Sequence, residues 1–277
     1  MYDPPVPLLG KTWHANAGII LLPLKLLYFE SPRDMISATK SVYVIGNGPS
    51  LNQIDIAKLR TKDTISFNRA FIAYKDWGFY PTYYMVMDPV VLENTKVEIK
   101  NLIRSSPISR FFLPANSREF FGENQNIQYI NIANRPVFNR WFWGKRFNKM
   151  KIIANVGATS IPVLKILGYE NFIILGTDCN YTETNIKNVK IEYHPEDKDR
   201  RIVYKSDGDS DPNHFRPDYF GTGTEYSKPQ QDNHFKGWEF IAGKTNQNKA
   251  NIILCSPGST LVKLFKEMEF EKAVELY

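Results

Sequence analysis

The sequence has only two cysteines, Cys179 and Cys255, among 277 residues. So few thiols exclude a disulfide-stapled fold and favour a reducing compartment, the cytoplasm. Neither cysteine belongs to a C-x-x-C pair, and the four histidines lie far apart along the chain, so the spacing predicts no structural metal site. We interpret both cysteines as small buried hydrophobic residues, since each ends a strand-like apolar run.

Long apolar runs and dense basic tracts are also lacking. An apolar run at residues 18–29 is shorter than the ~20 residues that cross a bilayer, and Pro23 and Lys25 interrupt it. Two interpretations stay open for this N-terminal extension, residues 1–40: a segment lying on a membrane surface, or one packed across the main domain. The 35 Lys and Arg against 29 Asp and Glu give a net charge of +6. These charges are spread along the chain, which favours anionic ligands and argues against a nucleic-acid partner.

The composition that is present belongs to a globular protein, with 43% hydrophobic and 23% charged residues. From residue 41 to 277, short β-rich runs alternate with helical periods, and Ser50 is expected to cap the first helix. This alternation predicts the α/β class, with a mostly parallel sheet covered by helices on both faces. Strands are expected at residues 41–45, 64–67, 83–87, 110–113, 127–132, 172–175 and 251–254, and helices at 51–59, 70–77, 91–103, 157–167, 235–244 and 259–267.

Residues 179–233 break this pattern, because charges, Gly, Asp and Tyr crowd together there with little periodicity. A structureless stretch of this length inside a domain is typical of a lid or a binding region. We therefore expect an irregular lid that forms the acceptor side of the site. Within it, Asp207, Asp209 and Asp211 could bind Mg²⁺ or Ca²⁺, but a solvated acidic turn is the favoured interpretation.

The first expected strand ends in a Gly-rich turn with the sequence GNGPS at residues 46–50. Gly46 and Gly48 let the backbone approach a phosphate or ribose closely, and a helix N-terminus offers free N–H groups. The turn is neither G-x-G-x-x-G nor a Walker loop, and a plain connector would look similar. Its place after the first strand of an α/β sheet favours the ligand-binding interpretation.

Polar residues follow other expected strands as well. Because carboxyl ends of parallel strands share one edge, where ligands bind in open α/β sheets, we predict that these residues line one site. Each residue taken alone is also explained as a helix cap or turn former. The candidates are Asn68 and Arg69 after the second strand, Asp88 after the third, Gly157 and Thr159 at a later helix start, and Gly176 and Asp178 after the next strand.

The ordered set of motifs between about residues 41 and 265 resembles the Rossmann-like bacterial sialyltransferases that build lipooligosaccharide. The motifs are GNGPSL at 46–51, Asn68, LGY at 167–169 leading into ILGTD at 174–178, His214, and LCSP at 254–257. The stretch NHFRPDYFG at 213–221 is also similar to a sister group of motility-associated factors and hydroxymethylpterin pyrophosphokinases.

The sialyltransferase resemblance implies an inverting transfer of a CMP-activated nonulosonic, sialic-acid-like sugar without a required metal or cofactor. It implies that Gly46, Asn47, Gly48 and Ser50 hold the CMP portion, and that Asn68 touches donor phosphate or sugar. It also implies that His214 is the general base, which suits the chemistry because imidazoles exchange protons near neutral pH. His194 and His234 are the nearest alternatives for this role. Lid tyrosines would stabilise the leaving phosphate, and the candidates are Tyr181, Tyr204 and Tyr219.

The sequence departs from the family pattern at the start of the later helix. The family's Arg falls on Ile153, and its Thr-Ser pair falls near Asn155 and Val156. Recognition of the donor sugar is therefore open, with Lys151 or Arg69 as candidates for the missing positive charge.

The resemblance further implies a glycan or glycolipid acceptor, an enzyme at the inner face of a bacterial membrane, and a homo-oligomer. Two alternatives remain: an ATP- and Mg²⁺-dependent pterin-type pyrophosphokinase using the aspartates of 207–211, and a nucleotide-binding module without catalysis. The aromatic residues between 138 and 147 are interpreted as a buried stripe rather than an acceptor surface.

Overall fold

The computed structural model describes residues 41–131, 147, 153–182, 203–206, 211–227, 229–245 and 250–277. All of them belong to one unit, Pro32–Tyr277. The predictions for the N-terminal extension, for residues 138–146, for Lys151, for His194 and for Asp207 and Asp209 lie outside the described residues, as does the side chain of Tyr204.

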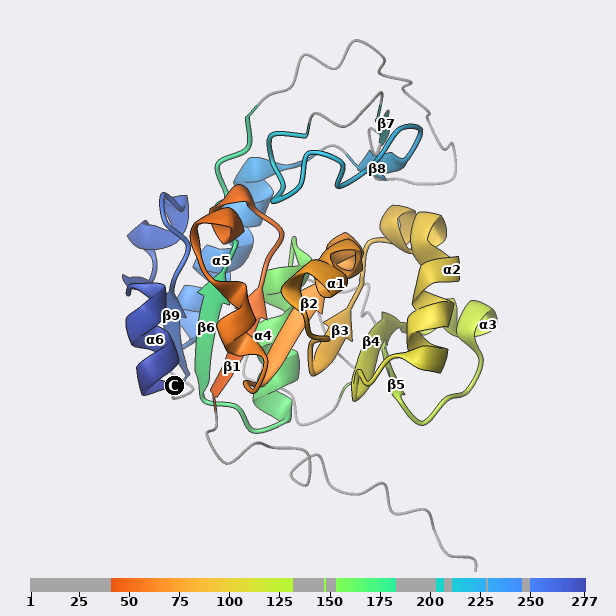
Figure 1. The fold of residues 1–277 in the computed structure, drawn as a ribbon, viewed down its shortest axis with the longest axis horizontal. Coiled ribbons are helices and arrows are strands. Elements are labelled where there is room, and N and C mark those ends of the chain that lie inside the picture. Colours follow the sequence, from red (N-terminus) through yellow and green to blue (C-terminus); the bar gives the residue numbers. More distant parts are fainter. Residues whose placement is uncertain are drawn as a thin grey trace, which may run out of the picture. The chain divides into compact units, whose positions relative to one another are not determined.

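The centre of the domain is an eight-stranded sheet in the order β10-β9-β6-β1-β2-β3-β4-β5 (Figure 1). Every neighbouring pair in this sheet is parallel, as the alternating pattern predicted. The strands are β1 (Ser41–Ile45), β2 (Thr64–Phe67), β3 (Tyr83–Met85), β4 (Arg110–Pro114), β5 (Ile127–Ile130), β6 (Asn171–Leu175), β9 (Asn251–Leu254) and β10 (Lys266–Glu267).

The first strand, β1, lies in the interior of this sheet, and later strands are added on both sides of it. Strands β2 to β5 follow β1 on one side, and β6, β9 and β10 are added on the other. The strand order therefore reverses between β1 and β6, whose residues pair directly from Ser41↔Asn171 to Ile45↔Leu175. Such a reversal opens a crevice at the carboxyl ends of the two strands, where open α/β sheets bind ligands.

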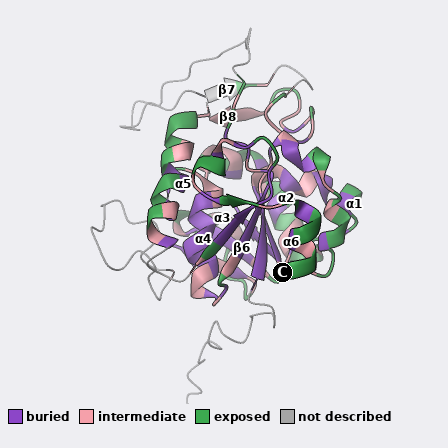
Figure 2. Cartoon of the chain, turned by 90° about the vertical axis from the view of Figure 1, so that its left-hand side faces the viewer, coloured by how far each residue is buried: buried purple, intermediate pink, exposed green. Residues whose placement is uncertain are grey.

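Helices cover both faces of the sheet because alternate strand residues point to opposite sides. Val42 and Val44 of β1 belong to one apolar cluster, whereas Tyr43 and Ile45 belong to a second. The first cluster contains residues of α4 and α5, and the second contains residues of α1, α2 and α6. Figure 2 shows the buried strands between helices that carry exposed residues. The helices are α1 (Tyr74–Trp77), α2 (Pro89–Ser105), α3 (Arg118–Phe121), α4 (Val156–Ile166), α5 (Gln231–Thr245) and α6 (Phe270–Leu276).

Two predicted helices are wrong. Residues 51–59 form two short 3-10 segments, Pro49–Gln53 and Ile56–Leu59, because the backbone at Ile54 is extended. Residues 259–267 form the 3-10 segment Thr260–Lys263 and then strand β10, which pairs with β9. In both places the apolar spacing is helical, but hydrogen bonds to distant parts of the chain decide the conformation.

The described part of the lid region contains a two-stranded antiparallel sheet, β7 (Val203–Lys205) and β8 (Glu225–Ser227). It lies above the carboxyl ends of the central strands (Figure 1). Asn94 of α2 donates a hydrogen bond to the Glu225 carbonyl at 3.2 Å, which ties this sheet to the main domain. The lid is therefore less irregular than the sequence suggested, and α5 already begins at Gln231.

Both cysteines are buried free thiols, as predicted. Burial raises the pKa of the Cys179 and Cys255 thiols to about 12, so neither is a thiolate nucleophile at neutral pH. Among the described residues, no helix combines the length and apolar character that a membrane span needs.

Candidate active site

A cavity of about 1030 Å³ lies at the carboxyl edge of the sheet, at the switch between β1 and β6. The turns after β1, β2, β3 and β6 form its wall together with the starts of α4 and α5 and part of the lid. Thirteen of the residues predicted to bind the donor or act in catalysis line it, namely Gly46, Asn47, Gly48, Ser50, Asn68, Arg69, Asp88, Gly157, Gly176, Asp178, Tyr181, His214 and Tyr219, whereas Thr159 does not.

The Gly-rich turn is shaped by close packing against the turn after β6. The Gly46 N–H donates to the Leu175 carbonyl and the Gly48 N–H to the Gly176 carbonyl, both at 2.7 Å. A Cβ atom on Gly48 would lie 2.9 Å from the Gly176 carbonyl oxygen and 2.6 Å from the Asp178 carboxylate. Glycine is therefore required here by the neighbouring backbone, and the expectation of free N–H groups at this turn is wrong for these two amides.

Asp178 stabilises the same turn through hydrogen bonds to Ser50. Its carboxylate accepts hydrogen bonds from the Ser50 N–H at 2.9 Å and from the Ser50 hydroxyl. Burial raises the pKa of Asp178, while the bonds from Ser50 and the proximity of His214 partly offset this shift. Ser50 is thus not the predicted helix cap, because its hydroxyl is bound to Asp178 and Gly48 holds the cap position.

Replacing Asp178 with alanine should lower the free energy of unfolding by about 2 kcal/mol, since two buried donors of Ser50 lose their acceptor. The midpoint of thermal unfolding should then fall by roughly 4–8 °C. Ser50→Ala is the matched control with a smaller expected loss, because the carboxylate keeps the backbone N–H. If the midpoint of thermal unfolding were unchanged in both variants, the hydrogen bonds between Asp178 and Ser50 would not stabilise the turn.

Two asparagines aim unsatisfied acceptors at the site. The Asn47 amide donates to the Phe67 carbonyl at 3.3 Å, which fixes its oxygen as the remaining group. Asn47 Oδ1 and Asn68 Oδ1 are both buried and have no hydrogen-bond partner among the described residues. Since buried polar atoms are normally paired, these two oxygens indicate the place of a ligand that offers donors.

Backbone strain gathers around the same cavity. Three non-glycine residues have positive φ among the described residues: Asn68 at 53°, Ala154 at 39° and Cys179 at 51°. All three line the cavity. Conformations of this kind cost about 1–3 kcal/mol each and concentrate at functional sites. The strain is therefore a second, independent pointer to this cavity as the functional site.

His214 lines the cavity and forms a dyad with Asp211. Its Nδ1 lies 2.6 Å from Asp211 Oδ2, and the His214 side chain is 16% exposed. Asp211 Oδ1 accepts the Asn213 N–H at 2.8 Å, which holds the carboxylate in place. A carboxylate on Nδ1 keeps that nitrogen as a donor and leaves Nε2 to accept a proton. Sequence reasoning treated Asp211 only as a candidate metal ligand; its spacing of three residues from His214 was the signal for this pair.

The loop that carries His214 is tied to the Gly-rich turn and to the end of β2. The Phe215 N–H donates to the Asn47 carbonyl at 2.9 Å. The Tyr219 ring stacks on His214 with centroids 3.9 Å apart and an interplanar angle of 3°. Arg69 Nε donates to the Tyr219 carbonyl at 2.6 Å. These contacts hold the imidazole beside the Gly-rich turn and the end of β2.

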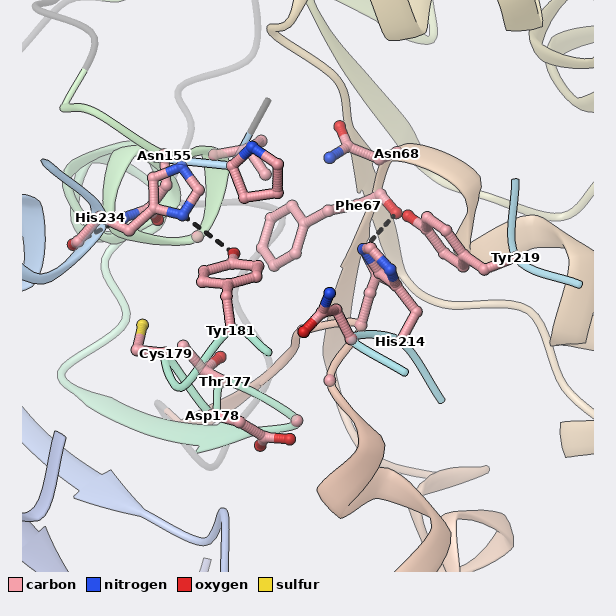
Figure 3. Close-up of a pocket in the computed structure, with 18 of the residues that line it drawn as sticks. Phe67, Asn68, Asn155, Thr177, Asp178, Cys179, Tyr181, His214, Tyr219 and His234 are labelled. Atoms are coloured by element: carbon pink, nitrogen blue, oxygen red, sulfur yellow. Dashed lines mark hydrogen bonds between the residues drawn. The ribbon is translucent and has the colours of Figure 1, made fainter. Parts of the chain in front are cut away.

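A second ring pair, Tyr181 and His234, lies in the opposite wall. The Tyr181 hydroxyl is 2.9 Å from His234 Nδ1, as the dashed line in Figure 3 marks. Burial raises the pKa of Tyr181 and lowers that of His234, so both are neutral near pH 7. The sequence singled out Tyr181 but left His234 only as a rival to His214.

Three predicted residues have structural roles. Asp88 caps α2, because its carboxylate accepts the Val90 N–H at 2.8 Å. Gly157 lines the cavity, and a Cβ atom there would lie 3.0 Å from the Trp238 ring. Thr159 is fully buried outside the cavity wall, and its hydroxyl accepts the Ile153 N–H at 2.9 Å. The prediction that Thr159 contacts a ligand is therefore wrong.

Asn155, one of the positions where the family pattern is broken, caps α4. Its Oδ1 accepts the Ala158 N–H at 2.7 Å, and its Nδ2 donates to the His234 carbonyl at 3.2 Å. Of the two candidate positive charges, Arg69 lines the cavity. Within the described ranges, no group of three His, Cys, Asp or Glu side chains could hold a metal ion.

These features define an open α/β fold of the Rossmann type, with a cavity at the point where the strand order reverses. The structure is similar to that of Cst-I, a monofunctional α-2,3-sialyltransferase from Campylobacter jejuni, with a TM-score of 0.50 and 16% identity over 83% of this chain and 81% of that one. It is also matched by CstII from Campylobacter jejuni in complex with the substrate analogue CMP-3FNeuAc, with a TM-score of 0.46 and 15% identity over 82% and 85% of the two chains. No family model and no curated protein matches the sequence.

Proposed function

We propose that this protein is an inverting glycosyltransferase that transfers a CMP-activated, sialic-acid-like nonulosonic sugar to a glycan hydroxyl, with His214 as general base. The observation that carries the proposal is the pairing of His214 with Asp211, at 2.6 Å, where His214 lines the cavity at the β1–β6 switch point. The similarity of the fold to that of Cst-I agrees with it.

The two unsatisfied asparagine oxygens support binding of a nucleoside. Asn47 Oδ1 and Asn68 Oδ1 accept hydrogen bonds, so they suit ribose hydroxyls or the exocyclic amino group of cytosine. An ionised phosphate offers no donor and would leave both oxygens unpaired. We therefore assign the nucleoside, rather than the phosphate, to Asn47 and Asn68.

The chemical step follows from the orientation of the dyad. Nδ1–H of His214 donates to Asp211, and Nε2 takes the proton of the acceptor hydroxyl as that oxygen bonds to the anomeric carbon. The bond from the anomeric carbon to the phosphate oxygen breaks at the same time, and CMP leaves with the bonding electrons. Attack from the side opposite CMP inverts the configuration. The proposed reaction uses no metal cofactor.

In this proposal the lid supplies the surface that binds the acceptor sugar. The Phe220 and Tyr226 rings stack with centroids 3.9 Å apart at 10°, and both residues line the cavity. Flat aromatic surfaces of this kind pack against the apolar faces of sugar rings. We propose a surface polysaccharide or glycolipid as acceptor, with the enzyme at the inner face of the membrane and as a homo-oligomer; the N-terminal extension is the segment to test for membrane contact.

A nucleotide panel tests the proposal directly. CMP should stabilise the protein by about 2.7 kcal/mol at one hundred times its dissociation constant. This should raise the midpoint of thermal unfolding by roughly 5–11 °C, to the same extent with and without Mg²⁺. CTP, UDP, GDP and ATP at equal concentrations are the comparisons.

Selective stabilisation by ATP with Mg²⁺ would overturn the transferase and favour pyrophosphoryl transfer instead. Of the three aspartates expected to bind Mg²⁺ in that alternative, the structure describes Asp211, and its carboxylate is hydrogen-bonded to His214. If CMP stabilises the protein but His214→Ala keeps full transfer activity, CMP remains the assigned ligand and His214 is excluded as the general base.

A further inference from the structure

The pair Tyr181–His234 is a second built feature of the cavity. The resemblance implies a role at the leaving phosphate for tyrosines such as Tyr181, whereas His234 has no role in the reaction described above. The hydroxyl of Tyr181, just after β6, lies 2.9 Å from Nδ1 of His234, in the first turn of α5. The two rings meet edge to face with centroids 5.4 Å apart. In Figure 3 the pair lies on the opposite side of Phe67 from His214.

The imidazole of this pair is placed by the packing of α5 against α4. The backbone N–H of His234 donates to the Gln230 carbonyl at 2.9 Å, and its carbonyl accepts the Asn155 amide at 3.2 Å. One turn later, a Cβ atom on Gly237 would lie 3.2 Å from the Ala154 side chain. These contacts fix the backbone of His234 without a contribution from a ligand.

The hydrogen bond between the two rings has two arrangements. Since burial keeps both groups neutral, one proton lies between the phenol oxygen and Nδ1. When Tyr181 donates that proton, its hydroxyl offers a ligand only lone pairs. When Nδ1–H of His234 donates instead, the hydroxyl hydrogen of Tyr181 is free to donate into the cavity.

The charges around the cavity favour the second arrangement for an anionic ligand. Arg69 is the only Lys or Arg among the described residues that line the cavity, and its Nε donates to the Tyr219 carbonyl. The carboxylates of Asp88 and Asp178 also line it. A phosphate here therefore depends on neutral hydrogen-bond donors more than on cations.

We propose that His234 is a positioning residue: its Nδ1–H donates to the Tyr181 oxygen and so directs the Tyr181 hydroxyl hydrogen to an oxygen of the CMP phosphate. This inference rests on the proposed function, because it takes CMP as the ligand. Donation from His234 also polarises the phenol, so the bond to phosphate strengthens as negative charge grows on the leaving group. Charge on the phosphate is then stabilised by a relay of two neutral rings.

The test compares the affinity of CMP with that of cytidine, which lacks the phosphate, for each purified full-length variant by titration calorimetry. Tyr181→Phe should weaken CMP binding by about 10- to 100-fold, the value of a hydrogen bond to a charged group. His234→Ala should weaken it by about tenfold, and the double variant should be no weaker than Tyr181→Phe. Cytidine affinity should stay unchanged in all three.

His234→Asn provides the rescue, because its side-chain nitrogen takes roughly the place of Nδ1 and can donate to the Tyr181 oxygen. It should restore CMP affinity to near the wild-type value. Tyr80→Phe is the matched control for loss of a phenol hydroxyl, since Tyr80 is 47% exposed and is not among the residues that line the cavity. Thermal unfolding of each variant separates this effect from a loss of α5 packing.

The outcomes separate a failure of the proposed function from a failure of the positioning role of His234. If wild-type protein does not prefer CMP to cytidine, the proposed function and this inference both fail. If wild type prefers CMP and His234→Ala keeps that preference, the transferase stands and the positioning role of His234 is overturned. Equal losses of CMP and cytidine affinity, or losses that add in the double variant, would assign His234 to packing alone.

Discussion

Replacing His214 with alanine should slow sugar transfer by about 100- to 10,000-fold, the usual contribution of a positioned general base. CMP affinity should change little, because the base contacts the acceptor hydroxyl rather than the nucleotide. The loss should therefore appear in kcat, while binding of CMP persists. The measurement is the rate of CMP release from a panel of CMP-activated nonulosonic sugars with a glycan acceptor.

Asp211→Asn gives a graded companion to this experiment. The amide would no longer hold Nδ1 of His214 as a donor in the way the carboxylate does, so transfer should slow without loss of CMP binding. Thermal unfolding of both variants checks that the loop stays folded. Transfer at the wild-type rate by His214→Ala would show that another group in the cavity accepts the proton.

Gly46→Ala should lower the free energy of unfolding by about 3 kcal/mol. A Cβ atom at this position would overlap the Gly176 carbonyl oxygen and lie 2.7 Å from Thr177 Oγ1. The carbonyl belongs to a backbone held in the sheet and cannot move aside as a side-chain end can. The midpoint of thermal unfolding should fall by roughly 6–12 °C, and nucleotide binding should weaken with it because Asn47 is displaced.

Gly243→Ala is the control for this substitution. Gly243 lies exposed inside α5, and a Cβ atom there would meet nothing within 4 Å. Alanine should therefore stabilise the helix by about 0.5–1 kcal/mol. If both variants unfolded at the same temperature, the close contact between the β1 and β6 turns would not be the reason for glycine at position 46.

Strands were predicted well where the sheet buries both faces. Residues 41–45, 64–67 and 251–254 form β1, β2 and β9 with the expected bounds. A short apolar run between turn residues has few alternatives to a buried strand. The helices at 51–59 and 259–267 failed for the opposite reason: their local periodicity allows a helix, but contacts with the turn after β6 and with β9 impose shorter structures.

The sequence predicted which residues line the cavity, but not which hydrogen-bond partners they have there. Asn68, Asp178 and His214 follow strands or lie in the lid, and the parallel topology brings them to one cavity. Their partners could not be inferred from spacing, because Asp178 meets Ser50 across 128 residues and Tyr181 meets His234 across 53.

The sequence by itself determined the α/β class, the mostly parallel sheet and the edge at which the cavity forms, since strands that alternate with helices are typical of this layering. Tertiary structure alone decided which polar residues brace the fold and which remain for chemistry. Asp178 and Asp88 satisfy backbone amides, whereas the side-chain oxygens of Asn47 and Asn68 have no partner in the part of the chain that the structure describes. The reason is physical: a hydrogen bond depends on angstrom-scale distances between segments that the chain order leaves far apart.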